Sequence, residues 1–413
     1  MAAINVGDTA FMLVAAALVL FMTPGLALFY AGMVRGKNVL STTMHSFVSM
    51  GLTTVLWALV GYTLAFGPAD GPLGGMIGGL SKLGLSGVAA GTSGVEGHLI
   101  PESVFAMYQG MFAIITVALI TGAIAERMKF KAYLIFAASW ALLVYSPLAH
   151  WVWGGGWLGL SGIGALDFAG GTVVHIASAA AALASSIALG KRKDYGKADL
   201  QPHNLPMTLL GAGILWFGWF GFNAGSELAA DGVAGSAFMV THLAAACGMV
   251  GWLAAEWIGH GKPTSLGAAS GAVAGLVGIT PAAGFVDVLP GMLIGLTAGV
   301  LCYFGLRLKK RFGFDDALDV VGVHGIGGTT GAILTGVFAS TAINAAGADG
   351  LLAGNPAQLL PQIVGEVATV GFSFAVSFAI LKLIDVTIGL RVDEETEERG
   401  LDISEHAETG YVL

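Results

Sequence analysis

Two histidines lie inside apolar, helix-patterned segments of this chain, and each follows an aspartate by eight residues: Asp167 precedes His175, and Asp316 precedes His324. Eight residues of α-helix rise about 12 Å, close to half of a hydrocarbon layer roughly 30 Å thick. An aspartate at each helix mouth would therefore place its histidine near the centre of a bilayer. An ionisable group at that depth is a functional candidate. Its chemistry is hydrogen bonding or proton transfer, because burial favours the neutral imidazole, with one N–H donor and one lone pair.

Each of these residues also has a purely structural interpretation. One buried histidine is ordinarily a neutral core residue that is hydrogen-bonded to a neighbouring helix, but two at matched positions favour a shared function. Either aspartate can cap its helix, because a carboxylate accepts backbone N–H bonds and suits the helix dipole. We expect both to cap, and capping is expected to be the whole role of Asp316. His45 and His242 lack a repeated partner and are expected to be structural.

Membrane-spanning helices are the elements that must position these residues. Hydrophobic residues make up 55% of the chain and charged residues only 11%, against about 25% charged in soluble domains. The apolar residues fall in runs of about 20, the length that crosses a bilayer as a helix. The sequence therefore predicts an all-α integral membrane protein with eleven transmembrane helices near residues 9–31, 43–66, 104–125, 130–149, 169–190, 205–226, 236–258, 265–285, 289–306, 321–341 and 362–388.

The basic residues predict the orientation of these helices. Of the 18 Lys and Arg residues, all but Lys82 fall on one side. Because positive charge marks the cytoplasmic side, the N-terminus is expected outside and the C-terminus inside. The first span has no preceding Lys or Arg and no small-residue cleavage site, so it is interpreted as helix one and not as a signal peptide. The expected location is the lipid bilayer of the cell membrane, plasma or inner, with multiple passes.

Two parts are expected along the chain. Residues 1–390 form the transmembrane domain, and residues 391–413 form an acidic cytoplasmic tail with eight acidic and two basic residues. This tail carries most of the net charge of −8. A solvated, regulatory and partner-facing segment is the first interpretation, and plain disorder is the alternative.

Glycine and the repeated Asp-x7-His unit predict how the helices are arranged. The 64 glycines are about twice the ordinary share of roughly 7%, and small residues let helices approach closely in lipid, as in 267–278 and 325–331. This indicates a compact bundle, with or without a narrow pore. The two units enter from opposite faces, which is typical of an inverted repeat of five plus five helices, with the eleventh appended. Such folds place their site at the midplane, so a passage for a small solute is expected.

Five ordered motifs carry a resemblance to a known family. The chain resembles the Amt branch of the Amt/Mep/Rh ammonium transporters over nearly its whole length. The tail is similar too, although Ala407 stands where the family often has glycine. The matching stretches are Ala149-His-Trp-Val-Trp153-Gly-Gly-Gly, Asp167-Phe-Ala-Gly-Gly-Thr-Val-Val-His175, Gly218-Trp-Phe-Gly-Phe222-Asn-Ala-Gly-Ser226, Gly278-Ile-Thr280-Pro and Asp319-Val-Val-Gly-Val-His324-Gly.

The resemblance implies a homotrimer with one pore through each subunit, and a PII-type signalling protein that plugs the cytoplasmic mouth. Trp153 and Ser226 are typical of Amt proteins and usually lost in Rh proteins. The implied roles are an outer recruitment site of Phe112, Trp153 and Ser226 with Asp167 beside it, a gate of Phe112 and Phe222, a pore lined by His175 and His324, and Thr280 near the outer vestibule.

The side-chain chemistry agrees with this assignment. A cation over aromatic faces gains about 0.5 to 2 kcal/mol, and a serine hydroxyl accepts an ammonium N–H that potassium cannot offer. A bare cation is costly in an apolar lumen, whereas ammonia is not. Ammonium is therefore expected to be recruited, deprotonated near the gate and passed as ammonia, and methylammonium is a possible further substrate. The proton either follows along the histidines, which makes transport electrogenic, or returns outside.

Other interpretations of the same residues remain open. Taken singly, Trp153 fits an interfacial aromatic belt, and Phe112 and Phe222 fit a core. An ammonium sensor acting through its tail is the alternative function, although residues 391–413 are too few for a fused signalling domain. A membrane redox or metal enzyme with the histidines as ligands is the other alternative, but no metal-ligand spacing accompanies them. ATP-driven pumping is not expected, because no Walker-type loop is present. No enzyme activity, cofactor, metal or nucleic acid is expected. No role is assigned to Glu366.

Overall fold

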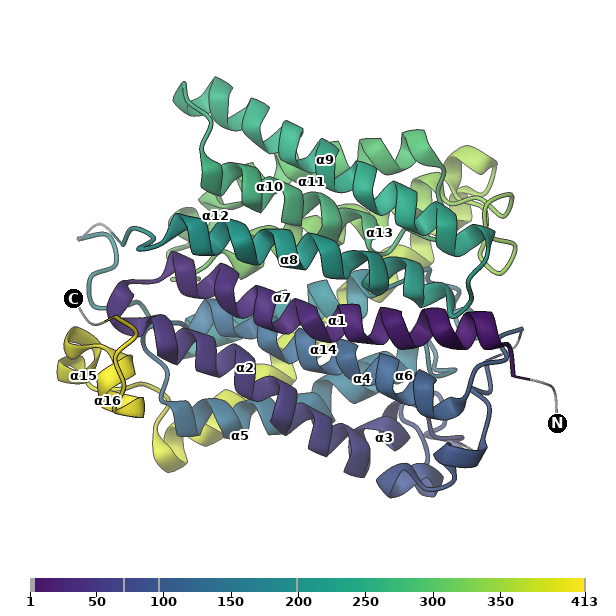
Figure 1. The fold of residues 1–413 in the computed structure, drawn as a ribbon, viewed down its shortest axis with the longest axis horizontal. Coiled ribbons are helices and arrows are strands. Elements are labelled where there is room, and N and C mark those ends of the chain that lie inside the picture. Colours follow the sequence, from purple (N-terminus) through teal and green to yellow (C-terminus); the bar gives the residue numbers. More distant parts are fainter. Residues whose placement is uncertain (1–3, 70, 96, 198–199, 412–413) are drawn as a thin grey trace.

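A bundle of long helices forms the molecule in the computed structural model, which describes residues 4–69, 71–95, 97–197 and 200–411 (Figure 1). Within these residues, ten helical segments are long and apolar enough to cross a membrane. They coincide with ten of the eleven predicted spans. The remaining prediction, 265–285, falls on a shorter apolar helix, Ser265–Ile279, so the count of eleven stays a prediction. The described residues contain two isolated bridges but no strand.

Several crossing segments are composite, because a short π-helical turn joins two α-helices or precedes one. Apart from five short 3-10 turns, the elements in chain order are α1 (Val6–Met33), α2 (Val39–Leu56), η2 (Trp57–Gly61), α3 (Tyr62–Phe66), α4 (Glu102–Ile124), α5 (Phe130–Trp140), η5 (Ala141–Tyr145), α6 (Ser146–Val152), η6 (Gly171–Ile176), α7 (Ala177–Leu189), α8 (Leu205–Ala224), η7 (Gly225–Glu227), α9 (Gly232–His260), α10 (Ser265–Ile279), α11 (Val288–Gly305), α12 (Arg307–Phe312), η8 (Val321–Gly325), α13 (Ile326–Phe338), α14 (Leu359–Ile388), α15 (Glu394–Arg399) and α16 (Leu401–His406).

The helix α10 ends earlier than the sequence predicted. It stops at Ile279 and not at residue 285, because Pro281 has no N–H to continue the helical hydrogen-bond ladder. The chain then turns, and the carbonyl of Pro281 accepts the N–H of Phe168 at 3.1 Å. This turn ties the end of α10 to the loop that precedes η6, where Asp167 lies.

Glycines bring the central helices into backbone contact. A Cβ atom on Gly331 of α13 would lie 2.1 Å from the carbonyl oxygen of Gly278 on α10. One on Gly275 would lie 2.2 Å from the carbonyl oxygen of Ala244 on α9. The predicted close approach of small residues is therefore present, and it holds together the helices behind the two histidines.

Replacement of Gly331 by alanine should destabilise the fold. The new methyl group would meet backbone, which cannot rotate away, so we expect a loss of about 1 to 3 kcal/mol and a lower melting temperature in detergent. Gly213→Ala is the matched control, because a Cβ atom there has no neighbour within 4 Å. Equal melting temperatures for Gly331→Ala and Gly213→Ala would refute this account of the packing.

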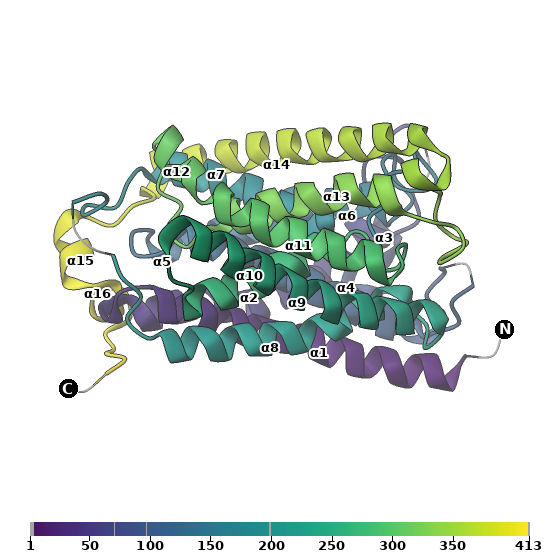
Figure 2. The same ribbon diagram turned by 90° about the horizontal axis from the view of Figure 1, so that it is seen from above.

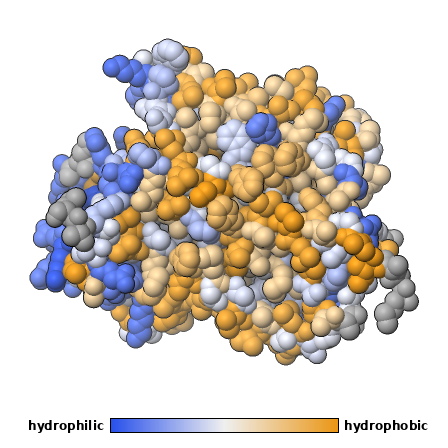
Figure 3. Space-filling view, viewed as in Figure 1, coloured by the Kyte–Doolittle hydropathy of each residue, from blue (hydrophilic) through white to orange (hydrophobic). Residues whose placement is uncertain are grey.

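The two ends of the bundle differ in polarity. The N-terminus lies at one end, and α12, α15, α16 and the C-terminus lie at the other (Figures 1 and 2). The face in Figure 3 is apolar along most of its length, and hydrophilic residues gather at the end of the tail. The segments rich in lysine and arginine, including α12, thus share one end with the tail.

A buried ionic network stabilises this polar end. Glu126 binds Arg35 at 3.0 Å and Arg192 at 3.1 Å, and Arg192 also binds Asp315 at 2.9 Å. Burial alone would raise the pKa of Glu126, but the hydrogen bond from Arg35 and the charge of Arg192 outweigh it and hold that pKa below its usual range. Since both carboxylates stay charged and paired, the network joins the ends of helices that are far apart in sequence.

The acidic tail is folded onto the same end. Leu401 and Asp402 of α16 are 1% and 3% exposed. The Asp402 carboxylate accepts the backbone N–H groups of Leu40 at 3.0 Å and Ser41 at 2.8 Å, so it caps the first turn of α2. The alternative of a disordered tail was therefore wrong for residues 391–411, because tail carboxylates satisfy helix N–H groups of the body.

Candidate functional site

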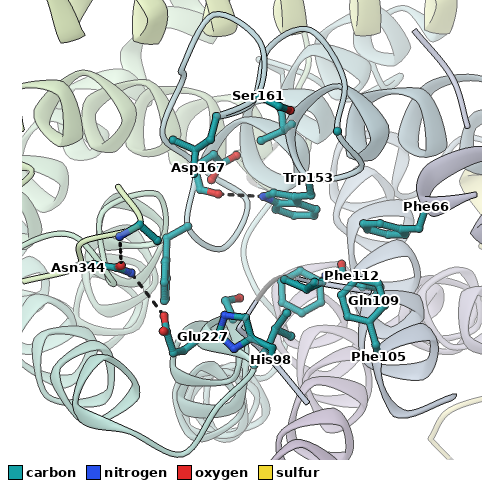
Figure 4. Close-up of a pocket in the computed structure, with 18 of the residues that line it drawn as sticks. Phe66, His98, Phe105, Gln109, Phe112, Trp153, Ser161, Asp167, Glu227 and Asn344 are labelled. Carbon is teal, nitrogen blue, oxygen red and sulfur yellow. Dashed lines mark hydrogen bonds between the residues drawn. The ribbon is translucent and has the colours of Figure 1, made fainter. Parts of the chain in front are cut away.

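A cavity of about 500 Å³ opens at the end of the bundle that carries the N-terminus (Figure 4). Four predicted site residues line it: Phe112 from α4, Trp153 just after α6, Asp167 from the loop before η6 and Ser226 from η7. The fold thus brings together side chains that are far apart in the sequence. Phe112 is only 1% exposed and lies at the inner limit of the cavity.

Aromatic rings close the inner limit of this cavity. The rings of Phe112 and Trp153 are 6.0 Å apart and nearly perpendicular, at 86°. Phe112 stacks on Phe222 of α8 with ring centroids 4.2 Å apart. Phe222 is not among the residues that line the outer cavity, and it borders a smaller space beneath. The stacked pair therefore separates the two spaces.

Ser226 presents an acceptor to the cavity. Its hydroxyl donates to the carbonyl of Phe222 at 2.8 Å, one helical turn earlier, and this uses its only proton. Tyr108 fixes the same turn, since its hydroxyl lies 2.9 Å from the carbonyls of Gly221 and Phe222 and 3.3 Å from the Ser226 hydroxyl. A lone pair of Ser226 is thus available to accept a hydrogen bond from a solute.

Asp167 organises the entrance through its hydrogen bonds. The carboxylate accepts the backbone N–H groups of Gly170, Gly171 and Thr172 at 2.6 to 2.8 Å, and that of Val173 at 3.2 Å. Gly170 has a φ of 114°, a left-handed conformation that lets the chain fold back over the carboxylate. This cap confirms the predicted structural role of Asp167.

The backbone of Asp167 also holds Trp153. The indole N–H of Trp153 donates to the carbonyl of Asp167 at 2.9 Å (Figure 4). One residue thus caps η6 with its side chain and orients an aromatic wall with its main chain. The helix starts at Gly171, so the assumption that all eight residues from Asp167 to His175 are helical was wrong: the first residues loop back to form the cap.

Both histidines lie in π-helical turns. His175 belongs to η6, where its N–H bonds to the carbonyl of Gly170 five residues earlier, and His324 belongs to η8. π-Helical turns are rare in proteins, and those that occur are frequently found at functional sites. They bring the two rings face to face, with centroids 5.2 Å apart and planes 20° apart.

The two imidazoles are in direct contact through nitrogen. Their Nδ1 atoms are 3.2 Å apart. Both rings are buried and neutral. The protonated Nδ1 of one ring donates a hydrogen bond to the unprotonated Nδ1 of the other, so the two rings adopt opposite tautomers. The Nε2 atom of His175 is buried and has no partner among the described residues. The pair therefore offers both a donor and an acceptor to a small solute.

The histidines connect a narrow space to a wider one. A pocket of about 10 Å³ is lined by Phe222, Trp219, His175 and His324, among others. His324 also lines a cavity of about 210 Å³ toward the polar end of the bundle. Three cavities thus follow one another along the rings of Trp153, Phe112, Phe222, His175 and His324.

Asp316 caps the second π-helical turn less completely than Asp167 caps the first. Its carboxylate accepts the N–H of Val321 at 2.7 Å, and this confirms the predicted cap. Burial, with the nearby charge of Asp319, raises the pKa of Asp316 to about 6, although Lys309 opposes the shift. The two Asp-x7-His units are therefore alike in layout and unequal in their electrostatics.

Thr280, which was predicted near the outer vestibule, contacts Trp219 and does not line the outer cavity. It is fully buried and is not among the residues that line the outer cavity. Its hydroxyl accepts the indole N–H of Trp219 at 2.9 Å, and Trp219 stacks on His175 with centroids 5.5 Å apart. The structure therefore favours a positioning role, in which Thr280 orients the tryptophan against the histidine.

The interpretation of the sequence missed three residues of this site. Tyr108 lies four residues before Phe112, and Trp219 lies three residues before Phe222, so helical spacing could have placed both on the site face. Glu227, which follows Ser226 and lines the outer cavity, had no such signal. Within the described residues, no group of three or more His, Cys, Asp or Glu side chains could hold a metal ion.

Comparison with known proteins points to one family. A model described as the Ammonium Transporter Family matches residues 10–411. An ammonium transporter of Bacillus subtilis (strain 168) is 55% identical over 408 residues, covering 98% of this chain and 99% of that protein. The crystal structure of Candida albicans Mep2 superposes with a TM-score of 0.90 at 35% identity, covering 99% of this chain and 94% of that one. A structure titled Sensor Amt Protein gives a TM-score of 0.87 at 28% identity, covering 97% and 98%.

Proposed function

The chain belongs to the ammonium transporter family, and from this premise we propose that it conducts ammonium nitrogen across the cell membrane through the path marked by the rings of Trp153, Phe112, Phe222, His175 and His324. The observation that carries the proposal is the contact of His175 and His324 beneath the stacked pair of Phe112 and Phe222. A desolvated path with paired donors and acceptors suits a small, neutral, hydrogen-bonding solute.

Recruitment takes place in the outer cavity. An ammonium ion beside Trp153 and Phe112 gains cation–π attraction, and one of its N–H groups donates to Ser226. Potassium has the same charge but no N–H group, so it cannot donate that hydrogen bond. The Asp167 carboxylate, which caps η6, also places a fixed negative charge in the same cavity wall. That charge stabilises the cation before it enters the narrow path below.

Passage follows deprotonation near the stacked phenylalanines. Ammonia avoids the desolvation cost of a cation in the apolar lumen, and it exchanges hydrogen bonds with His175 and then His324. The proton has two routes, and they differ in a measurable current. Transfer across the 3.2 Å contact between the two Nδ1 atoms makes transport electrogenic, whereas return to the outer cavity leaves it electroneutral.

The proposal extends to the larger assembly. We infer eleven crossing helices with α10 as the shortest, an inverted repeat of five plus five helices, an outer N-terminus and a cytoplasmic C-terminus. Three copies form a homotrimer with a pore in each subunit. The clustering of the basic segments and the tail at one end supports this orientation.

The tail, residues 391–413, is the regulatory element in this proposal. Its described part, residues 391–411, binds the body at the polar end, where Lys193 pairs with Glu398 at 2.5 Å. A PII-type signalling protein is the expected partner at this face. Failure of such a protein to co-purify with the transporter under every nucleotide condition would remove this part of the proposal.

A sensor is the second candidate function, because the chain is also similar to a structure titled Sensor Amt Protein. In that case ammonium binding would change the docking of the tail with little flux. Uptake of labelled methylammonium by cells without other ammonium transporters separates the two functions. We expect saturable uptake with the chain expressed, and uptake equal to that of the empty cells would favour the sensor.

A further inference from the structure

Glu227 is a carboxylate in the outer cavity to which the proposed mechanism gives no role. It directly follows Ser226, and the next residue, Leu228, has a left-handed φ of 61° that turns the chain sharply. The Glu227 side chain lines the cavity and lies across from His98 in the close-up (Figure 4). Its place beside the serine is therefore fixed by the end of η7 and not by a mobile loop.

Three other carboxylates near this end accept backbone N–H groups. Asp167 caps η6, Asp231 accepts the N–H groups of Val233 and Ala234, and Asp8 accepts that of Ala230 at 2.9 Å. Glu227 is different. Its contact is with the amide nitrogen of Asn344 at 3.5 Å, which is at the limit of a hydrogen bond.

Glu227 differs from Glu102 in its lack of a basic partner among the described residues. In the part of the chain that the structure describes, no lysine or arginine forms an ion pair with it. Lys82, the basic residue at this end, pairs with Glu102 at 2.8 Å. Burial lowers the pKa of His98, so the imidazole that faces Glu227 is neutral near pH 7. Burial, with the nearby charge of Asp231, raises the pKa of Glu227 to about 7. Above that pH the carboxylate is mostly charged, and its charge acts on whatever solute enters the cavity.

We propose that Glu227 is a cation-concentrating residue of the outer cavity, which draws ammonium and small alkylammonium ions to the Ser226 acceptor. The proposal rests on the proposed transport function. A carboxylate in a narrow, partly desolvated cavity raises the local concentration of cations. It attracts potassium as well, so selectivity stays with Ser226 and the aromatic rings, and Glu227 sets the apparent affinity.

The test compares Glu227→Gln with the wild type in methylammonium uptake at low and high sodium chloride, at a pH above the pKa of Glu227, which is about 7. At low ionic strength we expect KM to rise about threefold to tenfold with an unchanged maximal rate. The difference should shrink in about 1 M salt, where the Debye length falls to roughly 3 Å. Glu227→Asp, which keeps the charge, should stay near the wild type.

Asp287→Asn is the matched control. It removes a charge at the same end while an asparagine can still accept the N–H of Val288, as Asp287 does at 2.7 Å. It should leave KM unchanged. An unchanged KM in Glu227→Gln, a fall in maximal rate alone, or an equal rise in Glu227→Asp would overturn the inference. Absence of saturable uptake in the wild type would instead defeat the proposed function.

Discussion

Replacement of Asp167 by alanine is expected to abolish uptake. The variant loses the fixed negative charge in the cavity wall and leaves four backbone N–H groups, three of η6 and that of Gly170 before it, without their acceptor. The loop that carries the carbonyl bonded to Trp153 then loses its anchor. We expect the rate to fall by about 100-fold or more, since charge-assisted hydrogen bonds of this kind contribute about 1.5 to 3 kcal/mol each.

Asp167→Asn separates the charge from the cap. The asparagine oxygen can still accept some of the N–H groups, so the fold around Trp153 is largely kept while the charge is lost. Uptake is expected to fall less than in Asp167→Ala and to remain well below the wild type. Wild-type uptake by Asp167→Ala, at normal expression in a nitrogen-starved assay, would exclude any role for this aspartate.

The double variant His175→Ala, His324→Ala is expected to lower saturable uptake about tenfold or more. Both partners of the Nδ1 contact disappear, and ammonia would cross the narrow space without hydrogen bonds. A lost hydrogen bond of about 1.4 kcal/mol corresponds to a factor of ten. Uptake of labelled methylammonium measures the effect, with protein amount checked by immunoblot.

His175→Gln, His324→Gln is the informative companion. Glutamine supplies a donor and an acceptor but does not titrate, so it should restore part of the uptake without a proton path. A current that disappears while uptake persists would assign the proton to the histidine pair. Uptake that is unchanged in the double alanine variant would contradict a histidine-lined path.

The main features of the fold could be predicted from composition and spacing. Long apolar runs identify crossing segments because a bilayer requires about 20 residues, and ten predicted spans coincide with helices of sufficient length. The short α10 was predicted too long, since hydropathy does not register the backbone effect of Pro281. The predicted caps on η6 and η8 are present because Asp167 and Asp316 are suitable acceptors at a helix start.

Features that depend on tertiary contact could not be predicted. The two π-helical turns bring His175 and His324 into contact, and no local pattern distinguishes them from α-helix. The high charge of the tail predicts a solvated segment. Asp402 is nevertheless buried, because its carboxylate accepts backbone N–H groups in the first turn of α2, which is far away in sequence. The position of Thr280 is of the same kind, since it depends on its contact with Trp219.

A step of ammonium applied to liposomes that contain the purified protein tests the central claim most directly. Luminal pH and transmembrane current are recorded together, so that net ammonia and net ammonium transport are both detected. The account predicts a saturable signal, in current or in pH, that exceeds protein-free liposomes and is lost in Asp167→Ala. Signals from wild-type liposomes that match those of protein-free liposomes in both channels would contradict it.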